Sequence, residues 1–310
     1  MSDVGQLQNL DEVIGAYREH QRRTRGLADA TLRNYESQAR LFVRATLGSD
    51  PVDLSELTPA DVVAFVSSLA TRWAPSSMKT SRTALRSFLR YLSVQGVSDG
   101  RLEEVVPRVA HWRLSSLPHR LSDTQLDQLL VSLQDVGGRP CGPRDRAIVR
   151  CLATLGLRPV EIARLRLEDL DWRAATLAVV RRKNRRGQVL PLPGQVGEAI
   201  ADYLHGHRPV TQAREVFVQQ VGPRRGEPIG ATAVSEVVAR ALERAGVKTS
   251  MAGAYVLRHT VASRMVARGV SLKEVADFLG HRDLDTAAIY AKLDLPALRE
   301  VAGVWPEVSS

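Results

Sequence analysis

The sequence predicts a mostly α-helical protein of two domains with one small antiparallel β-sheet. Apolar residues recur at helical spacing along most of the chain, whereas alternation typical of strands is confined to 175–180 and 188–192. A stretch at 106–119 has prolines near both ends, a serine pair and little periodicity, as expected of a linker. Since 310 residues with 44% hydrophobic content can form two cores, we expect domains at 1–107 and 119–310.

The first domain is expected to contain helices at 10–23, 29–46, 58–72 and 75–96. Asp29 is a candidate N-cap for the second helix. Thr58 followed by Pro59 is typical of a cap and a first helical position, and Gly96 is expected to end the fourth helix. These signals predict a small, all-helical unit.

One face of the fourth helix carries a line of cations: Lys79, Arg82, Arg86 and Arg90. Steps of three, four and four residues place these side chains on a common stripe. Such a stripe can follow a phosphate backbone. A merely solvated face is the alternative, but it would normally mix charges, so we favour contact with DNA.

The overall charge also favours a polyanionic partner. Lys and Arg total 43 against 34 for Asp and Glu, with a net charge of +9. No apolar run approaches the roughly 20 residues that a spanning helix needs, so we expect a cytoplasmic protein with no membrane association. Cys141 and Cys151 fit neither a redox pair nor a zinc site, and His205 and His207 lack partners at ligand spacing. We expect no metal and no cofactor.

The second domain should contain helices at 121–133 and 143–156, then the two strands, then two or three further helices. Arg158 precedes Pro159, which disfavours helix at the arginine and suits the first helical position. Arg158 is therefore expected at a helix N-terminus, where it can grip phosphate oxygens. Glu161 is expected to cap this helix or to hold Arg158.

Further candidates lie beyond this helix. The hairpin turn RRKNRRG contains Lys183, together with Arg182, Arg185 and Arg186 as candidate contacts to a DNA backbone. Tyr255 and Arg258 share one face of a helix at 254–269, while His259 points elsewhere and is expected to be structural. His281 follows Gly280, and Tyr290 comes nine residues later.

Taken in order, Arg158 with Glu161, Lys183, Leu257–Arg258–His259, Leu279–Gly280–His281 and Tyr290 resemble the motifs of the tyrosine recombinase family. This family includes phage integrases and the Xer-like recombinases that resolve bacterial chromosome dimers. The resemblance spans roughly 120–293, and the helical first half is similar, more loosely, to the family's core-binding domain. It implies an N-terminal core-binding (SAM-like) domain of four helices, followed by a larger helical catalytic domain that bears the small sheet.

The resemblance also implies a mechanism. Tyr290 would attack a DNA phosphodiester and form a 3′-phosphotyrosyl link while a 5′ hydroxyl leaves. Arg158 and Arg258 would clamp the nonbridging oxygens, His281 would assist by hydrogen bonding, and Lys183 would protonate the leaving oxygen. Two bidentate arginines can supply the positive charge that Mg²⁺ supplies to other phosphoryl transfers.

Tyr255 departs from the family's pattern, because a histidine usually lies three residues before the second arginine. A phenol can hydrogen-bond to phosphate but cannot readily carry a proton near neutral pH. We nevertheless count Tyr255 among the catalytic candidates and expect activity to be retained.

The resemblance further implies double-stranded DNA as partner and a homotetramer on two sites, with or without a second recombinase. Apolar residues after Tyr290 would then contact a neighbouring subunit or pack on their own domain. Integration, transposition and dimer resolution all stay open. A type IB topoisomerase-like strand transferase and a homologue that binds recombination sites without cutting are the alternatives.

Overall fold

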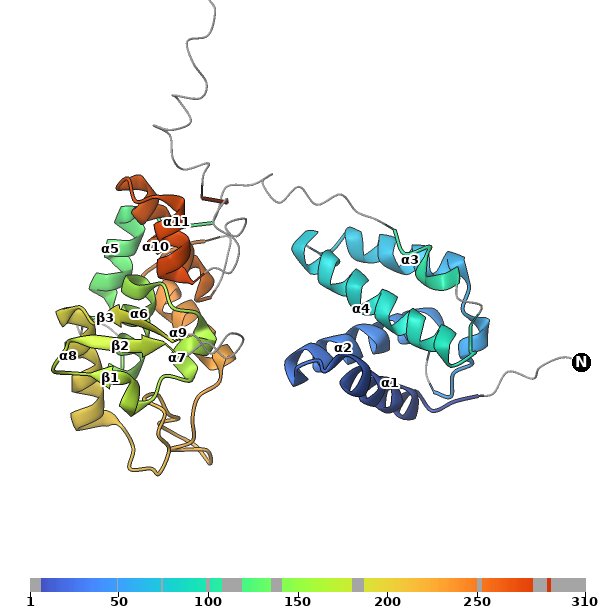
Figure 1. Cartoon of the computed structure of the whole chain (residues 1–310), viewed down its shortest axis with the longest axis horizontal. Coiled ribbons are helices and arrows are strands. Elements are labelled where there is room, and N and C mark those ends of the chain that lie inside the picture. Colours follow the sequence, from blue (N-terminus) through green and yellow to red (C-terminus); the bar gives the residue numbers. More distant parts are fainter. Residues whose placement is uncertain are drawn as a thin grey trace, which may run out of the picture. The chain divides into compact units, whose positions relative to one another are not determined.

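The computed structural model describes residues 7–48, 50–73, 75–98, 101–107, 119–134, 141–179, 187–249, 253–280 and 289–290. The chain divides into two compact units, Met1–Trp112 and Arg113–Ser310. Both are built mainly of helices, and the described residues contain one small antiparallel sheet, in the second unit (Figure 1). The predicted fold class is confirmed.

The helices of the N-terminal unit are α1 (Leu10–Arg25), α2 (Asp29–Thr46), α3 (Pro59–Ala70) and α4 (Pro75–Val94), with short 3₁₀ turns η1 (Leu54–Glu56) and η2 (Arg101–Glu103). Thr58 caps α3 as predicted, with its hydroxyl accepting from the Asp61 amide and Pro59 as the first helical residue. The prediction for Asp29 was wrong, because Ala28 is the N-cap and Asp29 begins the helix. Its carboxylate accepts a hydrogen bond from Arg22 instead of capping the helix.

Aromatic side chains form much of the core of this unit. The rings of Phe42 and Phe65 meet edge to face with centroids 5.2 Å apart, and Tyr17 meets Phe88 in the same way at 5.2 Å. Val106 is also buried in this core. Val106, the first residue of the stretch expected to be a linker, thus packs with the N-terminal unit and lies inside the domain expected at 1–107.

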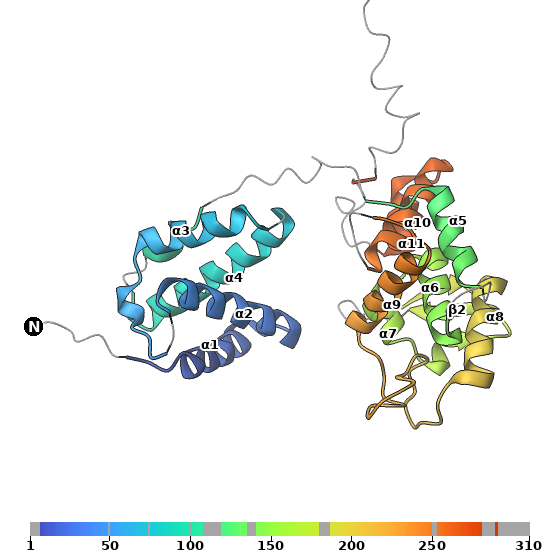
Figure 2. The same ribbon diagram turned by 180° about the vertical axis from the view of Figure 1, so that it is seen from behind.

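The C-terminal unit contains α5 (Asp123–Ser132), α6 (Pro143–Leu155), α7 (Pro159–Ala163), η3 (Leu167–Asp169), β1 (Leu170–Asp171), β2 (Thr176–Val179), β3 (Gln188–Pro191), α8 (Gly194–Asp202), η4 (Tyr203–His207), α9 (Ala231–Arg244), α10 (Tyr255–Ala267) and α11 (Leu272–Leu279). α10 and α11 lie together at one end of the unit and α8 lies towards the other, in both the front view and the view from behind (Figure 2).

The sheet has the strand order β1-β2-β3, with both pairs antiparallel. β2 and β3 lie in the two predicted strand segments, whereas the two-residue β1 was not predicted. Leu177 faces Leu190 across the hairpin and both are buried, which fixes which face is turned to the core. Val179 and Gln188 form the last pair of the ladder, at the ends of the connecting segment.

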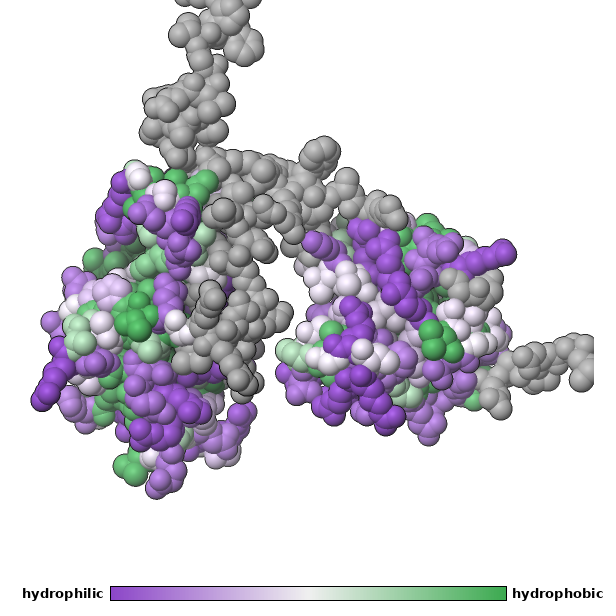
Figure 3. Space-filling view, viewed as in Figure 1, coloured by the Kyte–Doolittle hydropathy of each residue, from purple (hydrophilic) through white to green (hydrophobic). Residues whose placement is uncertain are grey.

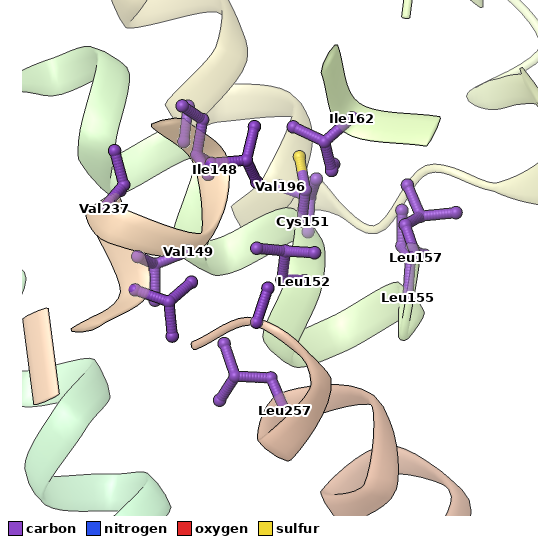
Figure 4. Packing of buried hydrophobic residues seen from close by; sticks show 14 of the residues in the cluster. Ile148, Val149, Cys151, Leu152, Leu155, Leu157, Ile162, Val196, Val237 and Leu257 are labelled. Carbon is purple, nitrogen blue, oxygen red and sulfur yellow. The ribbon is translucent and has the colours of Figure 1, made fainter. Parts of the chain in front are cut away.

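α6 is the central helix of this unit and packs against α8, α9 and α10. Five of its residues are completely buried, and Leu152 faces Leu257 of α10 (Figure 4). Cys141 and Cys151 are both free and buried, and burial raises the pKa of the Cys151 thiol to about 12. As predicted, the two cysteines behave as small apolar residues.

A smaller apolar cluster joins α10 and α11. Ser271 caps α11 together with Glu274 in a capping box, and Gly280 ends it with φ of 59°. The cluster includes Val261, Leu279 and, unexpectedly, Tyr290.

The described surface is largely hydrophilic on the face drawn in Figure 3, with small apolar patches scattered over both units. Within the described part of the chain, no helix is both long enough and apolar enough to cross a lipid bilayer.

Candidate active site

Arg158 lies at the N-terminus of α7, as the proline after it predicted. The Glu161 carboxylate accepts from the Arg158 backbone amide at 2.8 Å and from its guanidinium Nη1 at 2.8 Å. Glu161 thus caps the helix and also holds the arginine, which were the two predicted roles. Arg158 Nη2 donates in addition to the Gly280 carbonyl oxygen at 3.1 Å, 122 residues away in the sequence.

Arg258 is buried in α10, with 4% of its surface exposed. Its Nη1 donates to the Gly156 carbonyl at 2.6 Å, and its Nη2 donates to the Leu279 carbonyl at 2.7 Å. Both acceptors lie at helix C-termini, where carbonyls lack intrahelical partners and carry partial negative charge. These charge-assisted bonds compensate the burial of the guanidinium and fix its plane.

The two arginines therefore converge on adjacent carbonyls, those of Leu279 and Gly280. This point immediately precedes His281 in the chain. The sequence identified both arginines as candidates, and the structure brings their guanidinium groups to one place.

Tyr290 is 1% exposed and packs in the α10–α11 cluster. Burial raises the pKa of its phenol to about 12, while the positive charges of Arg258 and Arg158 act in the opposite direction. Both arginines are therefore near enough to act on this hydroxyl. In this conformation the phenol is neutral at pH 7 and shielded from solvent.

His259 is the direct partner of Tyr290. Its Nδ1 lies 2.7 Å from the phenolic oxygen, and the two rings are tilted by 53° with centroids 5.8 Å apart. Burial, assisted by the charges of Arg258 and His119, lowers the pKa of His259 to about 4. The expectation that His259 is only structural overlooked this contact with the candidate nucleophile. No pattern in the sequence indicates it, because the two residues are 31 positions apart.

Tyr255 begins α10 and keeps 50% of its surface exposed, whereas Arg258 one turn later is buried. The two residues lie on the same side of the helix, but Tyr255 is exposed to solvent and Arg258 is buried. Tyr255 is thus accessible to a ligand that binds at this end of α10.

Several candidates lie outside the described residues. These are Lys183, His281, Arg182, Arg185, Arg186 and the apolar segment after Tyr290.

In the cationic stripe of α4, two of the four side chains bind groups of the N-terminal unit itself. Arg86 donates to the Val106 carbonyl at 2.7 Å, and Arg90 forms an ion pair with Glu103 at 2.8 Å. Lys79 is exposed, and Arg82 is partly buried, which lowers the pKa of its guanidinium. An acid from η2 thus lies beside a stripe that contains no acid in its own helix.

Two family models match the chain. The phage integrase family matches residues 119–295, and the phage integrase N-terminal SAM-like domain matches residues 14–96. The fold and these matches define a site-specific DNA recombinase of the tyrosine class, an enzyme that cuts and rejoins DNA, and the chain belongs to the phage integrase family.

Individual relatives agree with this assignment. The chain is 40% identical over 297 residues to the putative integrase/recombinase y4rA of Sinorhizobium fredii, covering 96% of this chain and 71% of the relative. It is 29% identical over 299 residues to the tyrosine recombinase XerC of Pelobacter propionicus, covering 95% of each.

Solved structures share the fold. The XerH site-specific recombinase bound to its difH substrate, in a pre-cleavage complex, superposes with a TM-score of 0.71 at 18% identity over 98% of this chain and 99% of that one. A lambda integrase tetramer bound to a Holliday junction gives a TM-score of 0.66 at 17% identity over 99% of this chain and 82% of that one.

Proposed function

We propose that Tyr290 is the nucleophile of site-specific DNA recombination by this chain. Its phenolic oxygen forms a bond to the scissile phosphorus, and the bond from phosphorus to the 5′ oxygen breaks. The phenol releases its proton to water, and Lys183 supplies one to the departing 5′ oxygen. The resulting 3′-phosphotyrosyl ester conserves the bond energy, so a 5′ hydroxyl from another strand can reverse the step without an energy source.

Arg158 and Arg258 bind the nonbridging phosphate oxygens in this proposal. Their guanidinium groups are held before substrate arrives, so little reorganisation is needed when charge develops on those oxygens. His281 adds a hydrogen bond to the phosphate, and Tyr255 lies at the exposed start of α10. The observation that carries the proposal is the meeting of both guanidinium groups at the end of α11, where their positive charges act against the rise that burial causes in the pKa of Tyr290.

The buried phenol belongs to the form of the enzyme without DNA. A pKa of about 12 keeps the hydroxyl protonated at pH 7, so an exposed phenolate does not form before substrate is present. Proton loss then accompanies attack on the phosphorus. His259, as the hydrogen-bond partner at 2.7 Å, holds the hydroxyl until that point.

The partner in this proposal is double-stranded DNA, and four copies assemble on two sites. The lambda integrase tetramer on a Holliday junction, which shares this fold, supports such an assembly. Lys79, Arg82, Arg86 and Arg90 contribute backbone contacts from α4, and Arg182, Arg185 and Arg186 contribute them from the hairpin. A cytoplasmic location accompanies action on DNA. Neither alternative, the topoisomerase-like enzyme or the non-cleaving homologue, is favoured by the named relatives.

Capture of the covalent adduct tests the proposal and identifies the target site in the same experiment. The purified full-length chain is incubated with nicked duplex fragments from the chromosome that encodes it, because a nick next to the cut traps the adduct. SDS is added, and protein-linked fragments are recovered and sequenced. We expect fragments that share one site, with the protein attached to a 3′ phosphate.

Tyr290→Phe should remove the adduct, whereas the matched variant Tyr203→Phe should retain it. Tyr203 is also buried in the C-terminal unit, where its hydroxyl accepts from the Val218 amide, so this control reproduces the loss of a buried phenol hydroxyl. An undiminished adduct in Tyr290→Phe would refute the assignment of the nucleophile.

A further inference from the structure

The last turn of α11 is the point on which the two arginines depend, and a third side chain also binds it. A helix of this length leaves its final carbonyls without intrahelical partners. Gln188 Nε2 donates to the Asp277 carbonyl at 3.1 Å and to the Phe278 carbonyl at 3.0 Å. The next two carbonyls in the chain accept from Arg258 and Arg158.

Four consecutive carbonyls, at 277–280, are therefore bound by three side chains from distant parts of the sequence. Gln188 comes from β3, Arg258 from α10 and Arg158 from the start of α7. These carbonyls belong to the last turn of α11 and to its C-cap Gly280, so a change in the backbone of that turn displaces all four of them together. A shift of the first two carbonyls would thus move the two that hold the arginines.

Gln188 is itself held rigidly. It pairs with Val179 in the β2–β3 ladder. Leu190, two residues further along β3, is buried and pairs with Leu177. The amide that reaches α11 thus extends from a fixed strand and not from a loose surface residue.

We propose that Gln188 is a positioning residue for recombination, which sets the directions of the Arg158 and Arg258 guanidinium groups through the last turn of α11. The inference rests on the proposed role of the two arginines in binding the scissile phosphate.

Two substitutions of Gln188 test whether its hydrogen-bond donor or merely the size of its side chain is required. Gln188→Met keeps the length and removes the amide donor, whereas Gln188→Lys keeps a donor that suits a helix C-terminus. Gln195→Met makes the same chemical change on the exposed face of α8 and serves as the matched control. Cleavage rates are measured on the captured target site, with circular dichroism used to establish that each variant is folded.

Each variant is assayed on two substrates, an ordinary phosphodiester and a methylphosphonate at the scissile position. The methylphosphonate has no negative charge on its nonbridging oxygen, so it depends less on correctly directed guanidinium groups. We expect Gln188→Met to slow phosphodiester cleavage about tenfold to a hundredfold, the effect of roughly 1 Å of misplacement. On the methylphosphonate, its rate should lie within about threefold of the wild-type rate, and Gln188→Lys and Gln195→Met should cleave both substrates normally.

Arg158→Ala distinguishes the two ways in which the reasoning can fail. If Arg158→Ala is slowed equally on both substrates, the proposed role of the arginines is wrong, and the inference fails with it. If Arg158→Ala is relieved by the methylphosphonate but Gln188→Met is not, the arginines bind phosphate and Gln188 has only a structural role. An unchanged rate in Gln188→Met would also overturn the inference.

Discussion

The buried pair of His259 and Tyr290 predicts that acid destabilises the C-terminal unit. Burial lowers the pKa of His259 to about 4 from an ordinary value of 6.5 in the unfolded chain. Between these values the unfolded state binds a proton that the folded state excludes, so stability falls as pH decreases from about 7 towards 4. Lowering the pH from about 7.5 to about 5 should cost roughly 2 kcal/mol through this residue alone.

His259→Asn tests the magnitude, because an asparagine amide can still hydrogen-bond to the Tyr290 hydroxyl but does not titrate. Urea unfolding is followed at both pH values in a background where Trp172, which lies in the C-terminal unit, is the sole tryptophan. The free energy of unfolding should fall by about 2 kcal/mol more in the parent than in His259→Asn. If the free energy of unfolding falls by the same amount in the parent and in His259→Asn, to within about 0.5 kcal/mol, the reasoning is refuted.

Nuclear magnetic resonance gives an independent measurement of the same quantity. The imidazole signal that disappears in His259→Asn should stay in its neutral form until the pH approaches 4. A signal that titrates near 6.5 would mean that the ring is accessible to water and that the contact with Tyr290 does not hold it.

Two further predictions concern the surroundings of the arginines. A Cβ at Gly156, whose φ is 61°, would lie 2.8 Å from Leu279 and 3.3 Å from Val261, so Gly156→Ala should cost about 2–4 kcal/mol of unfolding free energy. Gly246→Ala, at φ of 67° with open space around it, should cost only about 1 kcal/mol, and equal losses in urea unfolding would contradict the close packing of Gly156 against Leu279 and Val261. Tyr255→His should cleave the captured site as fast as the parent or faster, and a complete loss of cleavage would show a role for Tyr255 that its exposed position does not explain.

Much of the helical framework was determined by the sequence itself. Thr58 with Pro59, and Arg158 with Pro159 and Glu161, begin helices through contacts within three residues. Such contacts depend on local geometry, which is why spacing alone predicts them. The hairpin was predictable for the same reason, since alternation reports on the two faces of a strand.

The prediction for Asp29 failed, and the sequence did not reveal one neighbour of the cationic stripe, because both depend on how separate elements pack. Asp29 could have capped its helix, but Arg22 of the preceding helix binds it. The cationic stripe of α4 lacked an acid in its own helix, but η2 brings Glu103 beside Arg90. Helix propensity and periodicity carry no information about such neighbours, because the neighbours of a residue depend on how the helices and strands pack.

The order and spacing of the motifs in the sequence also indicated that Arg158, Arg258 and Tyr290 belong to one site. Only the tertiary structure decided that both guanidinium groups end on adjacent carbonyls of α11 and that His259, expected to be structural, holds the Tyr290 hydroxyl. The physical reason is that these contacts span 21 to 122 residues, so they exist only once α6, α10 and α11 have packed their apolar faces together.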